Sequence, residues 1–158
     1  MALFMQVDGI KGSATEEHHT DWISIQSFQW GVGRGISSPT GASSDRETSV
    51  PSVSEIVITK PYDASTSDLF SWSLGGSEGK KVVIELISTG HEDEAILHYE
   101  LENTLISGFS QSSGGDGMSE SISLNFTKVT MRTMGVGEDL NTKSPVTVGW
   151  DLGQQKKV

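Results

Sequence analysis

The chain has 158 residues, no cysteine and a formal net charge of −10, from 11 basic and 21 acidic side chains. A chain of this length can bury roughly 70% of its unfolded surface, so we expect one domain over residues 1–158 that needs neither disulfide nor metal. The lack of cysteine excludes thiolate zinc sites and cysteine nucleophiles, and the negative charge disfavours nucleic-acid binding. No apolar run approaches the roughly 20 residues of a membrane helix, so membrane insertion is not expected.

The N-terminal residues do not have the features of a cleavable signal peptide. Met1–Asp8 lacks both the basic segment and the long apolar run that such a signal requires. If the protein leaves the cell, we therefore expect a route that does not use a signal peptide.

Two short clusters contain residue types that bind metals. In Glu16-Glu17-His18-His19, adjacent residues of a strand would point in opposite directions, and no third ligand follows at a recognisable spacing. We interpret this cluster as a polar loop, and His91-Glu92-Asp93-Glu94 as a solvated turn between strands. No metal or cofactor site is expected.

Two apolar segments change phase in their middle. Ile23 and Ile25 occupy odd-numbered positions, whereas Phe28 and Trp30 occupy even-numbered positions. The apolar residues of 122–131 change from even-numbered to odd-numbered positions in the same way. A change of parity without a break in apolarity predicts a β-bulge or a strand that crosses between two packed sheets.

The segment Gly35–Pro51 has little apolar content to bury. We expect a long loop without regular structure, and loops of that length inside compact domains are usually either functional or disordered. A second loop, Gln111–Ser119, lies between two strong strand patterns and predicts a hairpin connection.

The middle of the chain predicts strands around one helix. Residues 56–58 and 82–86 alternate as strands, and Asp63–Gly75 has possible caps and apolar residues at mixed helical spacing, which predicts a helix. Residues 146–152 also alternate as a strand near the C-terminus.

The clearest strand covers Ala95–Phe109. Its apolar row includes Leu101 and Leu105, and His98, Glu100 and Glu102 lie on the opposite, wet face. Asn103 interrupts the apolar row and Gly108 lies near the end, so we expect the strand to bend there.

Motifs of enzyme chemistry are missing from the sequence. No GK[ST] follows the glycines of 31–35, no Gly-x-Ser-x-Gly occurs, and paired carboxylates such as Glu100 and Glu102 share an exposed face. We interpret the tryptophans as core or interface residues, with a sugar-binding platform as the less favoured alternative. They are Trp22, Trp30, Trp72 and Trp150.

The motifs as a set resemble a known family over essentially the whole chain. They are Val7–Ser13, Ile23–Gly31, Ile58–Leu69, Leu105–Ser110, Glu120–Phe126 and Gly149–Leu152. In this order and at this chain length they resemble the haemolysin-coregulated protein (Hcp) family, the tube-forming component of type VI secretion systems.

The resemblance implies an all-β fold, a β-barrel of two packed antiparallel sheets with one short α-helix, similar to phage tail tube proteins. It implies that six copies form a ring and that rings stack into a tube, which a contractile sheath expels. The implied partners are a VgrG-type spike protein, sheath and baseplate proteins, and effectors in the lumen. It further implies a non-enzymatic protein that is cytoplasmic before firing and secreted afterwards.

By position, the segment Gly35–Pro51 resembles the extended loop of the family, which reaches an adjacent subunit or ring. We expect residues 38–47 to become ordered on ring stacking. Arg46 could form a bidentate pair with a carboxylate of a neighbour, although a solvated side chain is an equally good interpretation. The expected contact residues are Ser38, Thr40, Ser44, Asp45, Arg46 and Glu47.

Three alternatives stay open at this point. One is a tail-tube subunit of another contractile injection system, which uses the same ring-forming fold. Another is a carbohydrate- or peptide-binding β-sandwich that uses exposed tryptophan. The third is a small β-barrel enzyme, which would require titratable groups that converge on one site.

Overall fold

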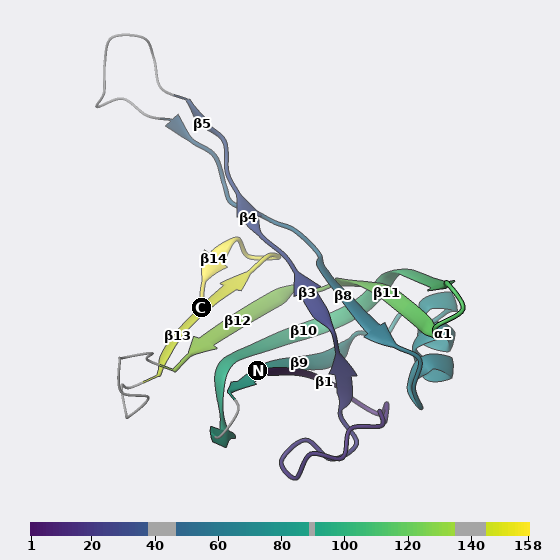
Figure 1. The fold of residues 1–158 in the computed structure, drawn as a ribbon. Coiled ribbons are helices and arrows are strands. Elements are labelled where there is room, and N and C mark those ends of the chain that lie inside the picture. Colours follow the sequence, from purple (N-terminus) through teal and green to yellow (C-terminus); the bar gives the residue numbers. More distant parts are fainter. Residues whose placement is uncertain (38–46, 89–90, 135–144) are drawn as a thin grey trace.

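The computed structural model describes residues 1–37, 47–88, 91–134 and 145–158. The fold consists of antiparallel strands and one helix (Figure 1). The elements are β1 (Ala2–Val7), β2 (Ile23–Ile25), β3 (Ser27–Gln29), β4 (Val32–Gly33), β5 (Ile36–Ser37), β6 (Glu47–Thr48), β7 (Ser52–Val53), β8 (Ile56–Pro61), α1 (Thr66–Leu74), β9 (Lys80–Ser88), β10 (His91–Ser113), β11 (Met118–Asn125), β12 (Lys128–Thr133), β13 (Val146–Asp151) and β14 (Lys156–Lys157). The predicted all-β class with one short helix is confirmed.

The long strand β10 belongs to two sheets. Its first half pairs with β9 and β12, and its second half pairs with β11. On one side the order continues through β9 to β1 and β2, and on the other through β11 to β8 and β3. Because only Gln26 separates β2 from β3, the chain passes directly from one sheet to the other, and strands of both sheets contribute to one core.

The predicted crossings between sheets are confirmed. β2 pairs with β1, whereas β3 pairs with β8, and the N–H of Gln26 at the crossing donates to the carbonyl of Thr59. In the same way β11 pairs with β8, whereas β12 pairs with β13. Each change of parity lets apolar residues of both strands face the same core.

The strand β10 bends at Asn103, as the sequence predicted. Asn103 has a φ of 51°, and the pairing of β10 with β9 shifts register between Leu101 and Thr104. This bulge adds one residue, so the buried side chains after Leu101 are Thr104 and Ile106. The expectation that Leu105 shares the buried face of Leu101 is therefore wrong.

The helix α1 lies within the range that its apolar spacing predicted and ends at Gly75. Leu69 and Trp72 are buried against the core, and Asp63 accepts a hydrogen bond from the N–H of Ser65 at 2.9 Å before the first turn. The predicted hairpin between β10 and β11 is also confirmed, although both strands extend into the segment expected to be a loop.

Two expectations about loops are wrong. The ends of Gly35–Pro51 form paired strands, since β5 pairs with β6, and the neighbouring β4 pairs with β7. Residues 91–94 belong to β10 and not to a turn, because His91 already pairs with Ser88. Among the described residues, no helix has the length and apolar character that a membrane crossing requires.

Candidate functional site

A two-stranded arm projects from the body of the molecule (Figure 1). We define the arm as residues 31–37 and 47–54, which contain the strand pairs β4–β7 and β5–β6. These ladders are only two residues long, and side chains supply further bonds: the N–H of Gly31 donates to Ser54 Oγ at 2.8 Å, and that of Gly35 to Ser49 Oγ at 2.7 Å. The arm thus has a defined backbone shape without a core of its own.

The arm carries apolar side chains in water. Val32 is 59% exposed, Ile36 50% and Val50 53%. Single exposed apolar residues are common on protein surfaces, but three of them on a thin projecting hairpin form a surface suited to contact with another chain. The arm is therefore the first candidate for an assembly surface.

An apolar cavity of about 280 Å³ lies where the arm meets β12, β13 and β14. Beside it, the Trp30 ring packs edge-on against the Tyr99 ring, with the ring centroids 5.6 Å apart. This contact joins the base of the arm to the core. The cavity is lined by Trp30, Val32, Pro51, Val53, Val129, Met131, Val148, Gly149, Trp150 and Lys157. All four tryptophans of the chain are buried or half-buried, in keeping with their interpretation as packing residues.

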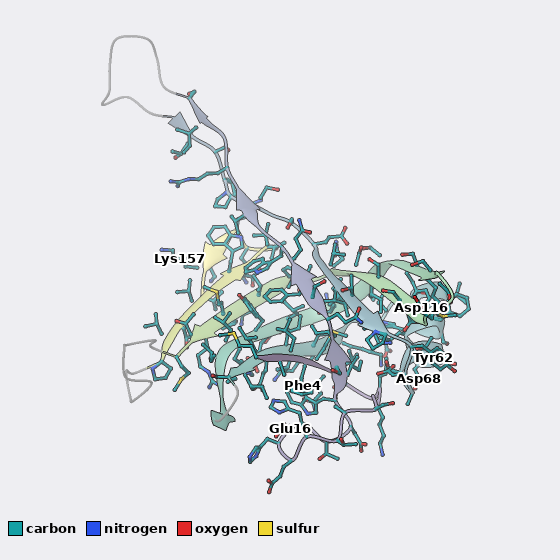
Figure 2. The ribbon with its side chains drawn as sticks, in the orientation of Figure 1. Phe4, Glu16, Tyr62, Asp68, Asp116 and Lys157 are labelled. Atoms are coloured by element: carbon teal, nitrogen blue, oxygen red, sulfur yellow. The ribbon has the colours of Figure 1, made fainter. Side chains whose placement is uncertain are left out.

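A second apolar patch surrounds α1. Phe70 and Leu74 of the helix are exposed, as are Tyr62 and Met118 nearby, and the Phe70 ring lies 5.5 Å from that of Phe109. Figure 2 shows Tyr62, Asp68 and Asp116 at this end of the molecule, away from the arm. The two exposed apolar surfaces thus lie on different parts of the chain.

A fully buried ion pair lies beneath the start of α1. Lys60 of β8 contacts Glu120 of β11, and both side chains are 0% exposed. Lys60 Nζ also lies 3.0 Å from Asp63, and Glu120 accepts hydrogen bonds from Thr66 and Gln111. Because every charge has a partner, this cluster ties two strands to the helix, and it is a structural feature.

Residues 16–19 lie in a loop, as predicted, but the side chain of His19 within this polar segment is buried. Its ring stacks on Phe4 with centroids 4.6 Å apart, and the edge of Trp22 completes the enclosure. Its Nδ1 contacts Glu16, and its Nε2 lies 3.5 Å from Glu85. Figure 2 shows Phe4 and Glu16 close together in this region.

The charged contacts continue along the sheet from Glu85. His98 lies 3.4 Å from Glu85 and 3.8 Å from Glu100, and Glu100 pairs with Lys81 at 3.0 Å. Burial raises the pKa of Glu85, but the nearby rings of His98 and His19 outweigh it, so the pKa lies below its ordinary value. We call Glu16, His19, Glu85, His98 and Glu100 the histidine–carboxylate chain.

The pKa values of the flanking carboxylates are lowered and that of Lys81 is raised. The hydrogen bond and charge of Lys81 lower the pKa of Glu100, and Glu100 in turn raises the pKa of Lys81. For Glu16, the hydrogen bonds from His18 and His19 outweigh burial and lower the pKa. Within the part of the chain that the structure describes, no group of three or more acidic or histidine side chains is arranged to hold a metal ion.

Of the six contact residues expected from the sequence, the structure describes one. Ser38, Thr40, Ser44, Asp45 and Arg46 fall outside the described residues, and Glu47 is the first residue of β6, opposite Ser37. The apolar residues at the base and sides of the arm were missed by sequence reasoning. The available signal was a valine between two small residues on each side of the arm: Val32 lies between glycines, and Val53 lies between serines.

Comparison with known proteins agrees with this fold. A solved structure of a type six secretion system protein superposes with a TM-score of 0.90 at 22% identity, covering 99% of each chain. Hcp1 from Salmonella typhimurium gives a TM-score of 0.81 at 19% identity, covering 99% of this chain and 98% of that one. A type VI secretion system effector from Yersinia pestis gives 0.74 at 20% identity, covering 94% and 98%.

At these identities the likeness shows the shared fold. A search of curated proteins gave no match. The profile of the family described as "Type VI secretion system effector, Hcp" matches residues 4–132, which is most of the chain. The chain therefore belongs to the Hcp family of type VI secretion system effectors.

Proposed function

We propose that this chain is the structural subunit of the inner tube of a type VI secretion system. Six copies close into a ring, and the rings stack into a tube that carries effectors in its lumen. A contractile sheath expels the tube with a VgrG-type spike at its tip, and baseplate proteins hold its base. The protein is cytoplasmic before firing and outside the cell afterwards, and its role is structural and not catalytic.

The observation that carries this proposal is the arm. Val32, Ile36 and Val50 are about half exposed on strand pairs that bury no core of their own. Covering such a surface removes apolar area from water, which favours association by roughly 25 cal/mol per Å² before the costs of binding. A stack of rings supplies that cover, because each arm then lies against a subunit of the next ring.

Ring closure requires two different surfaces of one subunit to meet. The sheet path ends at β14 on one side and at β3 on the other, and each of these strands pairs with a single neighbour among the described elements. Unpaired strand edges readily form contacts between chains. We propose that these edges, with the nearby apolar cavity, contribute to the contact between neighbours in a ring.

The net charge affects the stacking of rings. Each subunit has a formal charge of −10, so rings repel each other at low ionic strength. Moderate salt screens this repulsion, and we expect light scattering from stacked rings to rise with salt. A signal that falls with salt would indicate that attractive ion pairs control stacking.

The arm proposal is tested by native mass and negative-stain images of three proteins. The unmodified protein and the control Met118→Ser are expected to give six-fold masses, annular particles and stacks. The double variant Val32→Ser/Ile36→Ser is expected to give rings without stacks. Met118 is the matched control, because it is an exposed apolar residue outside the arm. Unchanged stacking of the double variant would contradict the role of the arm.

A further inference from the structure

The exposed side of α1 carries two apolar side chains. Phe70 is 49% exposed and Leu74 72%, although Leu69 and Trp72 of the same helix are buried. Because Phe70 and Leu74 are four residues apart, their side chains lie next to each other on one face of the helix. The centroid of the Phe70 ring lies 5.5 Å from that of Phe109 in β10. We call Phe70 and Leu74 the apolar knob of α1.

The cavity beside the arm has the opposite shape. Its volume is about 280 Å³, and its walls include Met131, Trp150 and the exposed Val148 of β13. A cavity of roughly 150 Å³ with apolar walls is already large enough to hold benzene. The cavity beside the arm can therefore accept an aromatic or a branched apolar side chain.

The apolar knob and the cavity lie at opposite ends of the molecule. Figure 1 shows α1 at one end, and β13 and β14 at the other. The knob therefore does not fill the cavity of its own subunit. A closed ring requires two different surfaces of one chain to meet, so that each copy offers one surface to one neighbour and the other surface to the next. The knob and the cavity are two such surfaces.

The end of the molecule around α1 is acidic. Asp68 is exposed on α1, and Figure 2 shows Asp116 at the same end of the molecule. The cation Lys80 lies over the ring of Trp72, 6.0 Å from its centroid, and Trp72 belongs to the buried side of the helix. A surface that covers the apolar knob should therefore bring positive charge with it.

The cavity has a positive charge in its lining. Lys157 of β14 is exposed and is the charged residue among the apolar residues and glycine that line the cavity. Asp151, the acidic residue of β13, is paired with Lys156 across the ladder and not with Lys157. Complementary charges steer two surfaces together and fix their relative orientation. The cavity thus complements the end around α1 in charge as well as in shape.

We propose that the apolar knob of one subunit enters the cavity of its neighbour in the ring, with Asp68 turned towards Lys157 of the partner subunit. This inference rests on the proposed ring and names the two surfaces that close it. Each copy uses both surfaces, so the same contact repeats around the ring. Covering Phe70 and Leu74 removes apolar area from water and favours association. Stacking of rings through the arm is a separate contact.

Chemical crosslinking tests the contact in the full-length protein, which has no cysteine of its own. The variant Leu74→Cys/Val148→Cys has one thiol on the knob and one at the cavity. A short bismaleimide is expected to join its subunits into a ladder of up to six copies on a denaturing gel. Either substitution alone should stop at the dimer, because a single thiol can form only one link.

A matched pair of thiols controls for chance collisions. In Leu74→Cys/Val57→Cys, the second thiol replaces an exposed valine of β8 that does not line the cavity. This control is expected to give no ladder beyond the dimer. Absence of the ladder from Leu74→Cys/Val148→Cys, or an equal ladder from the control, would overturn the contact.

Native mass separates this contact from the tube proposal on which it rests. Phe70→Ser/Leu74→Ser should require at least about tenfold higher protein concentration to form rings, whereas Met118→Ser, an exposed apolar residue of β11, should form them as the unmodified protein does. Rings that form equally well in the double variant would overturn the knob contact alone. A monomeric unmodified protein would contradict the tube proposal and this contact together.

Discussion

The body and the arm of this molecule use the same kinds of residue in opposite ways. In the body, apolar side chains of both sheets are enclosed around one core, with Ile58, Leu101 and Leu124 fully buried. In the arm, Val32 and Ile36 remain in water on strands of two residues. The body encloses its apolar side chains with its own contacts, whereas the arm leaves them exposed, and we propose that another copy covers them.

The largest expected effect comes from breaking the buried ion pair of the body. Lys60→Met leaves Glu120 buried without its cation, which should lower the free energy of unfolding by about 3–5 kcal/mol. The control Lys81→Met removes an exposed pair with Glu100 and should cost about 0–1 kcal/mol. Urea denaturation measures both, and equal losses would show that burial of the pair does not matter.

A glycine of the body is expected to be far less tolerant than a glycine of the arm. A Cβ at Gly79 would lie 2.6 Å from Asn103 Cα, at the bulge of β10, whereas a Cβ at Gly33 in the arm meets nothing within 4 Å. Gly79→Ala should destabilise by about 1–3 kcal/mol through overpacking. Gly33→Ala should change the unfolding free energy by less than about 0.5 kcal/mol. Thermal unfolding of the two variants tests this, and a tolerated Gly79→Ala would contradict the close contact.

The acid sensitivity of the body should depend on Glu85. Its pKa lies below the ordinary value of 4.5, so the stability it contributes is present above that pH and is lost as pH falls through the lower, folded value. Glu85→Gln should therefore lower the melting temperature near neutral pH and match the unmodified protein in strong acid. The exposed Glu17→Gln serves as a control, and a constant difference at all pH values would contradict this linkage.

The smallest effect on stability is expected in the arm. Val32→Ser/Ile36→Ser removes side chains that are already exposed, so the free energy of unfolding of the single chain should change by less than about 0.5 kcal/mol for each substitution. The same variant should lose ring stacking. Urea denaturation under conditions that prevent assembly measures the first part, and a large loss there would mean that the arm packs on its own chain.

Much of the body could be predicted from the sequence because its strands alternate. The parity change between Ile25 and Phe28 predicted the crossing from β2 to β3, and the spacing of Leu69 and Trp72 predicted α1. The face of Leu105 could not be predicted, because the bulge at Asn103 inserts one residue and reverses the parity after it. Alternation gives the register only until a bulge resets it.

The candidate surfaces were harder to predict. The arm has ladders of two residues, too short for a pattern, so its ends were expected to be a loop. Lys60 has the inward parity of Ile58, and Glu120 that of Ile122, so a signal for the buried pair existed but was hidden by the usual exposure of charged residues. The burial of His19 depends on how the loop folds back, which no local pattern encodes.

The native mass of the purified protein, with negative-stain images of the same sample, tests the central claim most directly. The tube proposal predicts a six-fold mass with annular particles, and stacks that disappear in Val32→Ser/Ile36→Ser. A monomer across a range of salt and protein concentration would contradict the proposal. It would leave the fold and the family intact but remove the assembly role of the arm.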